Sequence, residues 1–364
     1  MTHDPAAVKR GCTRFLSYDP PQTPREILLT LAEEAQDGDL DDFGRGGPHE
    51  RLEARLREVL GKEAAVFMAA GRVAQLAALK AWCQARGNDR VAMHPRCHMA
   101  EYEDRAYDLV YGLKAVPIGD PNRPTVLADL EALTDPVGVI SLEIPLFSLG
   151  CVLPPWEELV AMSAWARERG IPIHADGARL WEIGPYYGRS YPEIASLFDS
   201  ITVSFYKSLE AIAGGAVAGP ATLIAAARTW QRRLGAAPFR MFPLVLSALH
   251  GLETRLHRVR DYYDRARRLA EALARVDGVI VSPNPPHATS MLVLLRGDPA
   301  RLRDAALEVS ARTGVWLMDF TQSSPLEGYA RLPLTVAAGA LEIGDDEAVE
   351  IVAELQRRIS AQEC

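Results

Sequence analysis

The sequence predicts an α/β fold with a mostly parallel central sheet, followed by a smaller α+β domain toward the C-terminal end. Three observations lead to this prediction. The chain has 364 residues, 48% of them hydrophobic, so it can bury a large core and is longer than one average domain. Short apolar runs alternate with amphipathic stretches over the middle of the chain. A second group of apolar runs, with two more helical stretches, follows a long helical segment.

The first fifty residues differ from the rest because they are polar and rich in turn-forming segments such as DPPQTP. We interpret residues 1–50 as an N-terminal arm that packs on another surface and has little core of its own. Residues 51–250 are then the large α/β domain. Residues 251–364 are a linker helix and the small C-terminal α+β domain.

Ordered structure is expected to begin with a helix at Pro48, because proline is favoured in the first helical turn. Leucines recur on one face of this helix from Leu52 to Leu60, and Gly61 is a natural end for it. The apolar run AAVFMA (64–69) then leads into a second helix.

Further strands and helices alternate through the middle of the chain. Strands are expected at RVAM (90–93), at VGVISLEI before Pro145, at IPIHA (171–175) and at SITVSFY (200–206). The segment PWEELVAMSAWARERG has apolar residues at helical spacing and ends at Gly170. Such alternation is typical of a sheet whose parallel strands are connected by helices.

A long amphipathic helix is predicted over residues 243–276, and helices of this kind often connect two lobes of a protein. The strand candidates VIVS, SMLVLL, VWLM and RLPLTV follow it. A helix near residues 299–313 and a final helix from about residue 344 complete the set. Together these elements predict the small domain.

The charge balance excludes two classes of partner. Forty Lys and Arg against 48 Asp and Glu give a net charge of −8, whereas nonspecific nucleic-acid binding and docking on anionic membranes need a basic surplus. No apolar run approaches the ~18 residues of a membrane span, and the N-terminus lacks the apolar core of a secretory signal. We therefore expect a cytoplasmic protein that binds neither nucleic acid nor membranes.

Motifs of several common enzyme classes are missing from the sequence. GxGxxG, Walker A, HExxH and GxSxG patterns do not occur, so an NAD-dependent Rossmann enzyme is a remote alternative. The cysteines are scattered and never form a CxxC pair, so we expect reduced, mostly buried thiols and no metal site. They are Cys12, Cys83, Cys97, Cys151 and Cys364.

Three segments of the predicted large domain suit one cofactor. Asp176 follows the run IPIHA within HADGARLW, and Lys207 ends the run SITVSFY, where burial would lower the pKa of its amine. Such an amine condenses with the aldehyde of pyridoxal 5'-phosphate, while a carboxylate keeps the ring nitrogen protonated. The segment AAGR (69–72) opens a helix and offers N–H groups to a phosphate. Each feature alone has an ordinary structural explanation, but together they predict a pyridoxal-phosphate site.

With these residues, the chain resembles the threonine aldolase and β-eliminating lyase family of fold-type-I pyridoxal-phosphate enzymes. The resemblance extends over most of the chain, from about Ser17 to the final helix, and HADGARL is its most specific part. Segments 51–71, HPRCH (94–98), RLGAAPFR (233–240) and RLPLTV are similar to further family segments. The resemblance implies a seven-stranded sheet in the large domain.

The resemblance also implies a role for each matched residue. Lys207, His98 and Asp176 are expected to be catalytic: the lysine holds the cofactor, the histidine stacks on its ring and the aspartate contacts its ring nitrogen. Arg331, with Ser17, is expected to bind the substrate carboxylate, since a guanidinium can donate two hydrogen bonds to it. The residues expected to bind the cofactor are Gly71, Arg72, His98, Asp176, Arg179, Lys207 and Arg240.

Three segments depart from the family pattern. The phosphate turn has Ala, Gly and Arg at positions 70–72 where the family usually has Ser-Gly-Thr. Residues 208–210 are Ser-Leu-Glu where the family has Gly-Leu-Gly. Residues 144–147 are Ile-Pro-Leu-Phe where threonine aldolases carry a polar Asn-Thr-His-Asn stretch. We therefore expect a more apolar pocket above the cofactor ring, with one candidate base fewer.

The resemblance implies a pyridoxal-phosphate-dependent lyase whose substrate is an L-α-amino acid. Retro-aldol cleavage of a β-hydroxy amino acid to glycine and an aldehyde is the expected reaction, because it is the family's usual activity. The alternative is β- or γ-elimination, replacement or racemisation of an amino acid with a less polar side chain, which residues 144–147 favour. A protein that binds the cofactor without turnover is a further hypothesis. The polar arm and the family's sites at dimer interfaces predict a homodimer or homotetramer.

Overall fold

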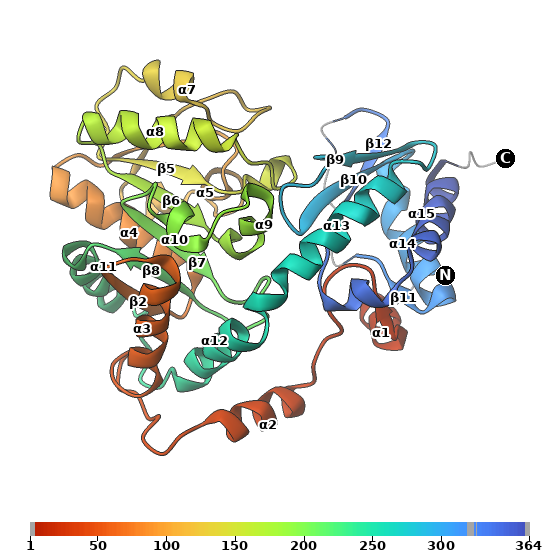
Figure 1. Cartoon of the computed structure of the whole chain (residues 1–364), viewed down its shortest axis with the longest axis horizontal. Helices are drawn as coiled ribbons and strands as arrows, with labels where there is room; N and C mark the ends of the chain where they lie inside the picture. Colours follow the sequence, from red (N-terminus) through yellow and green to blue (C-terminus); the bar gives the residue numbers. More distant parts are fainter. Residues whose placement is uncertain (1–3, 319–323, 325, 361–364) are drawn as a thin grey trace. The chain divides into compact units, whose positions relative to one another are not determined.

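The computed structural model describes residues 4–318, 324 and 326–360, and the chain divides into two compact units (Figure 1). The large unit consists of residues 23–257. The small unit consists of residues 1–22 together with residues 258–364. The first 22 residues therefore group with the C-terminal part of the chain, and residues 23–50 group with the large unit.

A seven-stranded sheet forms the centre of the large unit, in the order β2-β8-β7-β6-β5-β3-β4. The five strands β7, β6, β5, β3 and β4 are parallel to one another, whereas β8 runs antiparallel to both β2 and β7. The prediction of a mostly parallel seven-stranded sheet is confirmed. The strands are β2 (Ala64–Met68), β3 (Arg90–Met93), β4 (Lys114–Pro117), β5 (Val139–Glu143), β6 (Ile173–Gly177), β7 (Ser200–Ser204) and β8 (Gly215–Gly219).

Helices cover both faces of this sheet (Figure 1). On β2, Val66 and Met68 belong to an apolar cluster with helices α4 (Gly71–Arg86) and α11 (Ala221–Arg233). The alternate residue Phe67 lies against His49 of α3 (Pro48–Leu60). The helices of the large unit are α2 (Pro24–Glu34), α3 (Pro48–Leu60), α4 (Gly71–Arg86), α5 (His98–Glu101), α6 (Ala106–Leu109), α7 (Leu127–Glu131), α8 (Trp156–Glu168), α9 (Gly184–Tyr187), α10 (Tyr191–Ala195), α11 (Ala221–Arg233) and α12 (Phe242–Thr254). The short 3-10 turns η1 (Phe147–Leu149) and η2 (Leu180–Glu182) belong to the same unit, and η3 (Leu256–Arg258) follows α12.

Helix α3 begins and ends as its sequence predicts. Pro48 occupies the first turn, and Leu52, Leu56 and Leu60 are fully buried on one face. Gly61 ends the helix at a φ of 62°, in the left-handed region that glycine adopts without a steric penalty.

The small unit contains a three-stranded antiparallel sheet in the order β12-β10-β9, and a two-stranded parallel pair of β1 with β11. The prediction of a small α+β fold in the C-terminal part is confirmed. The strands are β1 (Arg14–Phe15), β9 (Val279–Ser282), β10 (Ser290–Arg296), β11 (Val315–Trp316) and β12 (Tyr329–Thr335). The helices are α1 (Pro5–Gly11), α13 (Val259–Leu273), α14 (Pro299–Thr313), the 3-10 turn η4 (Ala338–Glu342) and α15 (Asp345–Ser360).

The prediction of one continuous helix over residues 243–276 is wrong. Helix α12 ends at Thr254, and α13 begins at Val259 after the 3-10 turn η3. The two helices serve different cores: Gly251 of α12 lies against the Leu209 carbonyl, so closely that a Cβ there would come within 2.3 Å of it, whereas Leu269 of α13 packs in the core of the small unit. The apolar residues of 243–276 therefore pack in two separate cores, although their helical spacing is nearly continuous.

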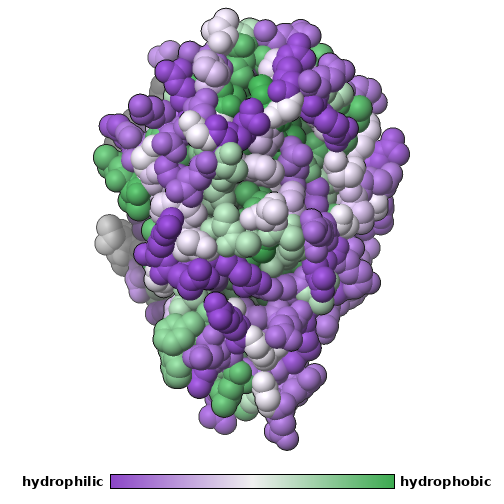
Figure 2. All heavy atoms as spheres, turned by 90° about the vertical axis from the view of Figure 1, so that its left-hand side faces the viewer, coloured by the Kyte–Doolittle hydropathy of each residue, from purple (hydrophilic) through white to green (hydrophobic). Residues whose placement is uncertain are grey.

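Among the described residues, no helix is long and apolar enough to cross a membrane, and no three His, Cys, Asp or Glu side chains gather to hold a metal ion. Hydrophilic residues form most of the face drawn in Figure 2, with hydrophobic residues in separate areas between them. Four of the five cysteines are buried and form no disulfide, and Cys364 lies outside the described residues.

The burial of His174 makes the free energy of unfolding depend on pH. It is fully buried on β6, with ring nitrogens 2.8 Å from Ser200 Oγ and 3.1 Å from Thr202 Oγ1 on β7, and burial lowers its pKa to about 3. The unfolded chain binds a proton near pH 6.5 and the folded protein does not. This contribution to stability is therefore present above about pH 6.5 and is lost as the pH falls toward 3.

Because of this histidine, we expect the free energy of unfolding to fall by roughly 2–3 kcal/mol when the pH is lowered from about 7 to 4. Urea unfolding at both pH values, for the wild type and for His174→Gln, measures it. The variant keeps polar groups for Ser200 and Thr202 but does not titrate. The expectation is contradicted if both proteins lose the same free energy on acidification.

Candidate active site

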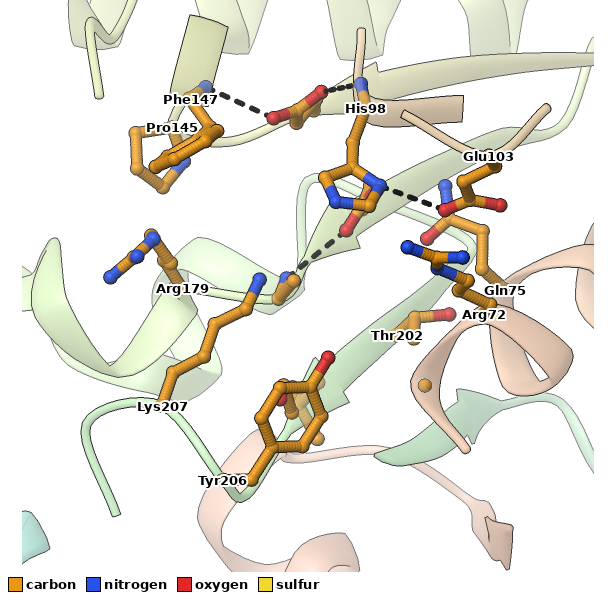
Figure 3. Close-up of a pocket in the computed structure, with 16 residues that line it drawn as sticks. Arg72, Gln75, His98, Glu103, Pro145, Phe147, Arg179, Thr202, Tyr206 and Lys207 are labelled. Atoms are coloured by element: carbon orange, nitrogen blue, oxygen red, sulfur yellow. Dashed lines mark hydrogen bonds and ion pairs between the residues drawn. The ribbon is translucent and has the colours of Figure 1, made fainter. Parts of the chain in front are cut away.

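A pocket of the large unit opens at the carboxyl ends of β5, β6 and β7, next to the N-terminus of α4 (Figure 3). The space between its lining side chains is about 540 Å³, open solvent included. Ligand sites of α/β sheets commonly form at this edge, because several loops meet there.

Lys207 projects into this pocket from the turn that follows β7, and His98 projects into it from the opposite side (Figure 3). The amine of Lys207 has a pKa below its usual value, first because it is removed from water and next because the Arg179 cation is near. A lowered pKa increases the fraction of uncharged amine, the form that attacks a carbonyl carbon.

Asp176 is the fourth residue of β6, so it lies within the strand rather than after it, and its side chain lines the same pocket. It lies directly beside Glu143 of β5 in the strand register. Burial raises the pKa of Asp176, whereas the charge of Lys207 lowers it. The Asp176 carboxyl group and the Lys207 amine thus line one pocket.

Glu143 connects two loops of the pocket. Its carboxylate accepts the backbone N–H of His98 at 2.6 Å and that of Phe147 at 3.0 Å. Burial, and next the neighbouring Asp176, raise its pKa to about 7. Glu143 therefore fixes the start of α5, which carries His98, against the segment that carries Phe147.

His98 is held by a second carboxylate. Its Nδ1 lies 2.8 Å from Oε1 of Glu103, whose side chain is only 4% exposed. The other oxygen of Glu103, Oε2, is buried without a hydrogen-bond partner and belongs to a side chain that lines the pocket. The ring of Tyr102 lies 5.3 Å from that of His98 and completes the support.

The N-terminus of α4 forms one end of the pocket. Gly71 and Arg72 begin this 16-residue helix, whose first N–H groups are available to an anion. The helix reaches the sheet closely because Gly215 of β8 has no side chain: a Cβ there would come within 2.8 Å of Gly71 Cα. Ser204, at the end of β7, adds a buried hydroxyl without a hydrogen-bond partner.

Residues 144–147 contribute apolar surface to the pocket. Pro145 and Phe147 line it, and the guanidinium of Arg179 lies 5.2 Å from the centre of the Phe147 ring. The Phe147 ring also contacts Tyr102 edge-on, with 6.1 Å between ring centres. An apolar and aromatic wall thus stands where the family pattern has polar side chains.

Arg240 does not line this pocket. Its guanidinium donates a hydrogen bond to the carbonyl oxygen of Asp41 and lies 4.0 Å from the centre of the Phe239 ring. The expectation that Arg240 binds the cofactor stays a prediction.

Ser17 and Arg331 belong to the small unit. Ser17 is fully buried, and its Oγ accepts the backbone N–H of Thr335 on β12 at 3.1 Å. Arg331 lies on the same strand opposite Leu294, with 3% of the residue exposed. The two residues predicted to bind a substrate carboxylate are thus associated with one strand, and their role there stays a prediction.

Sequence reasoning missed several residues of the pocket. Glu103 follows His98 by five residues, and Glu143 is a single acid at the end of an apolar run. An isolated acid directly before the end of a buried strand is a signal that could have been used for Glu143. The residues that line the pocket and were not predicted include Gln75, Glu103, Glu143, Thr202, Ser204 and Tyr206.

These residues fit pyridoxal phosphate. The buried amine of Lys207 suits its aldehyde, Asp176 suits its ring nitrogen, and the helix end at Gly71 suits its phosphate. The unpartnered Ser204 hydroxyl and Glu103 oxygen also point to a polar ligand, because buried polar atoms normally have a hydrogen-bond partner.

Comparison with known proteins points the same way. The family model described as beta-eliminating lyase matches residues 23–296. Low-specificity L-threonine aldolase 1 of Arabidopsis thaliana is 28% identical over 278 residues, which cover 72% of this chain and 76% of that protein. The low specificity L-threonine aldolase of Escherichia coli K12 is 27% identical over 289 residues, which cover 78% and 84%.

Solved structures extend the similarity to nearly the whole chain. A protein of Listeria monocytogenes EGD-E, provisionally named an L-allo-threonine aldolase, has a TM-score of 0.90 and 30% identity, covering 97% of this chain and 98% of that one. A protein of Exiguobacterium sp. 255-15, provisionally named an aromatic amino acid beta-eliminating lyase/threonine aldolase, also has a TM-score of 0.90, at 32% identity, covering 97% and 99%.

Proposed function

This chain belongs to the β-eliminating lyase family, and from that premise we propose that it is a pyridoxal-phosphate-dependent lyase of an L-α-amino acid. The proposed reaction cleaves the Cα–Cβ bond of a β-hydroxy amino acid and gives glycine and an aldehyde. The observation that carries the proposal is that Asp176 of β6 and Lys207, in the turn after the adjacent strand β7, line one pocket. A buried amine and a buried carboxylate are the groups that this cofactor requires of a protein.

When bound, the cofactor supplies an electron sink for the electron pair of the bond that is broken at Cα. Lys207 would hold it covalently at its aldehyde carbon, and Asp176 would keep its ring nitrogen protonated. Gly71 and Arg72 at the start of α4, together with the Ser204 hydroxyl, would bind its phosphate.

His98 and Glu103 would handle the proton of the substrate hydroxyl. The Glu103 carboxylate accepts Nδ1–H of His98, so Nε2 is the nitrogen that can accept a proton. Nε2 takes the hydroxyl proton as the Cα–Cβ bond breaks, and the oxygen that loses the proton becomes the aldehyde carbonyl. This route uses no side chain of residues 144–147.

Arg331 and Ser17 of the small unit would orient the substrate through its carboxylate. The guanidinium can donate two parallel hydrogen bonds to a carboxylate, which fixes both position and direction. A carboxylate held at two points would restrict the rotation of the substrate and so the orientation of its Cα–Cβ bond.

Release of glycine and acetaldehyde from L-threonine tests the proposed reaction. The purified protein, loaded with the cofactor, is expected to release both products in equal amounts, and the Lys207→Ala variant is expected to release neither above background. Lys114→Ala is the matched control, because Lys114 is exposed on the edge strand β4. No glycine from threonine or other β-hydroxy amino acids, in protein that binds the cofactor, would contradict this reaction.

The apolar wall of Pro145 and Phe147 favours a second candidate reaction, elimination, replacement or racemisation on an amino acid with a less polar side chain. In that case Lys207 removes the proton on Cα. Exchange of the Cα proton in deuterated water, measured by mass spectrometry for apolar amino acids, tests it. Exchange without glycine release supports this candidate, and glycine release without exchange on apolar amino acids contradicts it.

We also propose that the protein is a homodimer or a larger homo-oligomer. Large apolar side chains of α2 and of the following loop are exposed, among them Leu28 at 62% and Leu40 at 66%. Phe43 and Phe239 are more than half exposed and contact each other edge-on, with 5.3 Å between ring centres. Light scattering on the eluted protein measures the mass. A monomer at micromolar concentration would contradict the proposal.

A further inference from the structure

The side chain of Glu182, in the 3-10 turn η2 after β6, is fully buried next to the pocket. One of its oxygens, Oε1, accepts two hydrogen bonds at once, from Nη1 of Arg179 at 2.7 Å and from the hydroxyl of Ser208 at 2.6 Å. Arg179 lines the pocket, and Ser208 is the residue directly after Lys207. A single carboxylate oxygen thus connects the segment after β6 with the segment after β7.

The segment that carries Lys207 is a turn fixed at several points. Its base is closed by a hydrogen bond from the Ala211 N–H to the Phe205 carbonyl at 2.9 Å. Within it, the Glu210 N–H donates to the Lys207 carbonyl, and Glu210 has a φ of 51°. The Glu210 carboxylate lies 2.5 Å from Nη2 of Arg255, after α12. Ser208 supplies the connection of this turn to the segment after β6.

The charges that act on the Lys207 amine come from four groups. Arg179 lowers its pKa, whereas Asp176, Glu143 and Glu182 raise it. Glu182 therefore acts in two ways: it is a negative charge near the amine, and it accepts the hydrogen bond that holds the Arg179 cation. Removal of its charge would act on Lys207 directly and would also leave Arg179 without this neutralising partner.

We propose that Glu182 is a positioning residue that, through Arg179 and Ser208, sets both the place of the Lys207 turn and the charge around its amine. The inference rests on the proposed function, since it assigns Glu182 to the lysine that would hold the cofactor. Glu182 itself need not touch the cofactor or the substrate. The Ser-Leu-Glu sequence at 208–210, which departs from the family's Gly-Leu-Gly, supplies the Ser208 hydroxyl and the Glu210 contact that this arrangement uses.

The first test uses the cofactor-free protein. Trinitrobenzenesulfonate modifies uncharged amines, and peptide mass analysis gives the rate of modification at Lys207 as a function of pH. In Glu182→Gln, which keeps an oxygen for Ser208 and Arg179, the profile is expected to move to lower pH by about one unit. An unchanged profile, or a shift to higher pH, in a protein with wild-type circular dichroism would overturn the proposal.

The second test separates position from charge. Ser208→Ala removes the hydrogen bond to Glu182 and is expected to speed release of bound pyridoxal phosphate about tenfold, followed by its fluorescence on dilution. Ser208→Thr restores the hydroxyl and is expected to restore slow release. Ser196→Ala, at an exposed serine outside the pocket, is the matched control. Equal release rates for the alanine and threonine variants would contradict a role for this hydrogen bond.

The two tests distinguish this inference from the proposed function. The modification profile of Lys207 needs neither cofactor nor substrate, so it reports on Glu182 even if threonine is not cleaved. Conversely, the wild type could cleave threonine while Glu182→Gln and Ser208→Ala behave like it in both tests. That result would support the proposed function and contradict the role of Glu182. Ser208 is partly exposed, so its alanine variant tests the arrangement even if Glu182→Gln does not fold.

Discussion

Substitution of Lys207 by alanine is expected to lower lyase turnover by at least about 10³-fold and to abolish covalent attachment of pyridoxal phosphate. The reason is chemical: no other lysine among the described residues lines the pocket at the ends of β5, β6 and β7. Without its amine, the pocket has no lysine that could hold the cofactor's aldehyde carbon. Turnover of L-threonine and the absorbance of bound cofactor after gel filtration measure both effects.

Two further variants make the Lys207 result specific. Lys207→Arg keeps a positive charge but has no nucleophilic amine, and we expect it to be as inactive as the alanine variant. Lys114→Ala is expected to match the wild type. Turnover and cofactor absorbance that survive in Lys207→Ala would show that another residue holds the cofactor, and the assignment of this pocket would be wrong.

Substitution of Asp176 by asparagine is expected to lower turnover by about 10²-fold or more while leaving the fold and the covalent attachment of the cofactor intact. Asparagine has nearly the same shape, so it can still accept the Ala178 N–H that Asp176 accepts at 3.1 Å. It carries no negative charge, so it cannot hold a proton on the ring nitrogen, and the electron sink is weakened.

The control for Asp176 is Asp37→Asn, at an exposed aspartate between α2 and α3. It removes one negative charge from the same unit at a position outside the pocket. The decisive comparison is kcat measured at saturating cofactor for both variants. Equal kcat values for Asp176→Asn and the wild type would refute a role for this carboxylate at the ring nitrogen.

The sheet could be predicted from the sequence because each strand carries its own signal. The runs that became β5, β6 and β7 are apolar enough to be buried on both faces, as parallel strands between helices are. Since the carboxyl ends of adjacent parallel strands meet at one edge, Asp176 and Lys207 could be predicted to lie close together. The structure has both residues lining one pocket.

The carboxylates around this pair could not be predicted in the same way. Glu103, Glu143 and Glu182 act through hydrogen bonds to His98, Phe147, Arg179 and Ser208, and several of these partners are distant in the sequence. Sequence periodicity shows which residues are buried in an element, but not which buried acid meets which donor. That information depends on how the loops at the sheet edge pack.

The break between α12 and α13 shows a related limit of periodicity. Residues 243–276 keep nearly continuous helical spacing, so the sequence favours one helix. The two parts pack in different units, however, and the helix ends where the first unit ends, near residue 257. Tertiary packing therefore breaks the helix, although the local sequence favours a continuous one.

One measurement tests the central assignment most directly. The protein loaded with pyridoxal phosphate is reduced with borohydride, digested and mapped by mass spectrometry, so that the residue that held the cofactor keeps it as a stable adduct. We predict that the adduct is on the peptide that contains Lys207. An adduct on another lysine, or none in protein that is folded and saturated with cofactor, would contradict the assignment of this pocket as the active site.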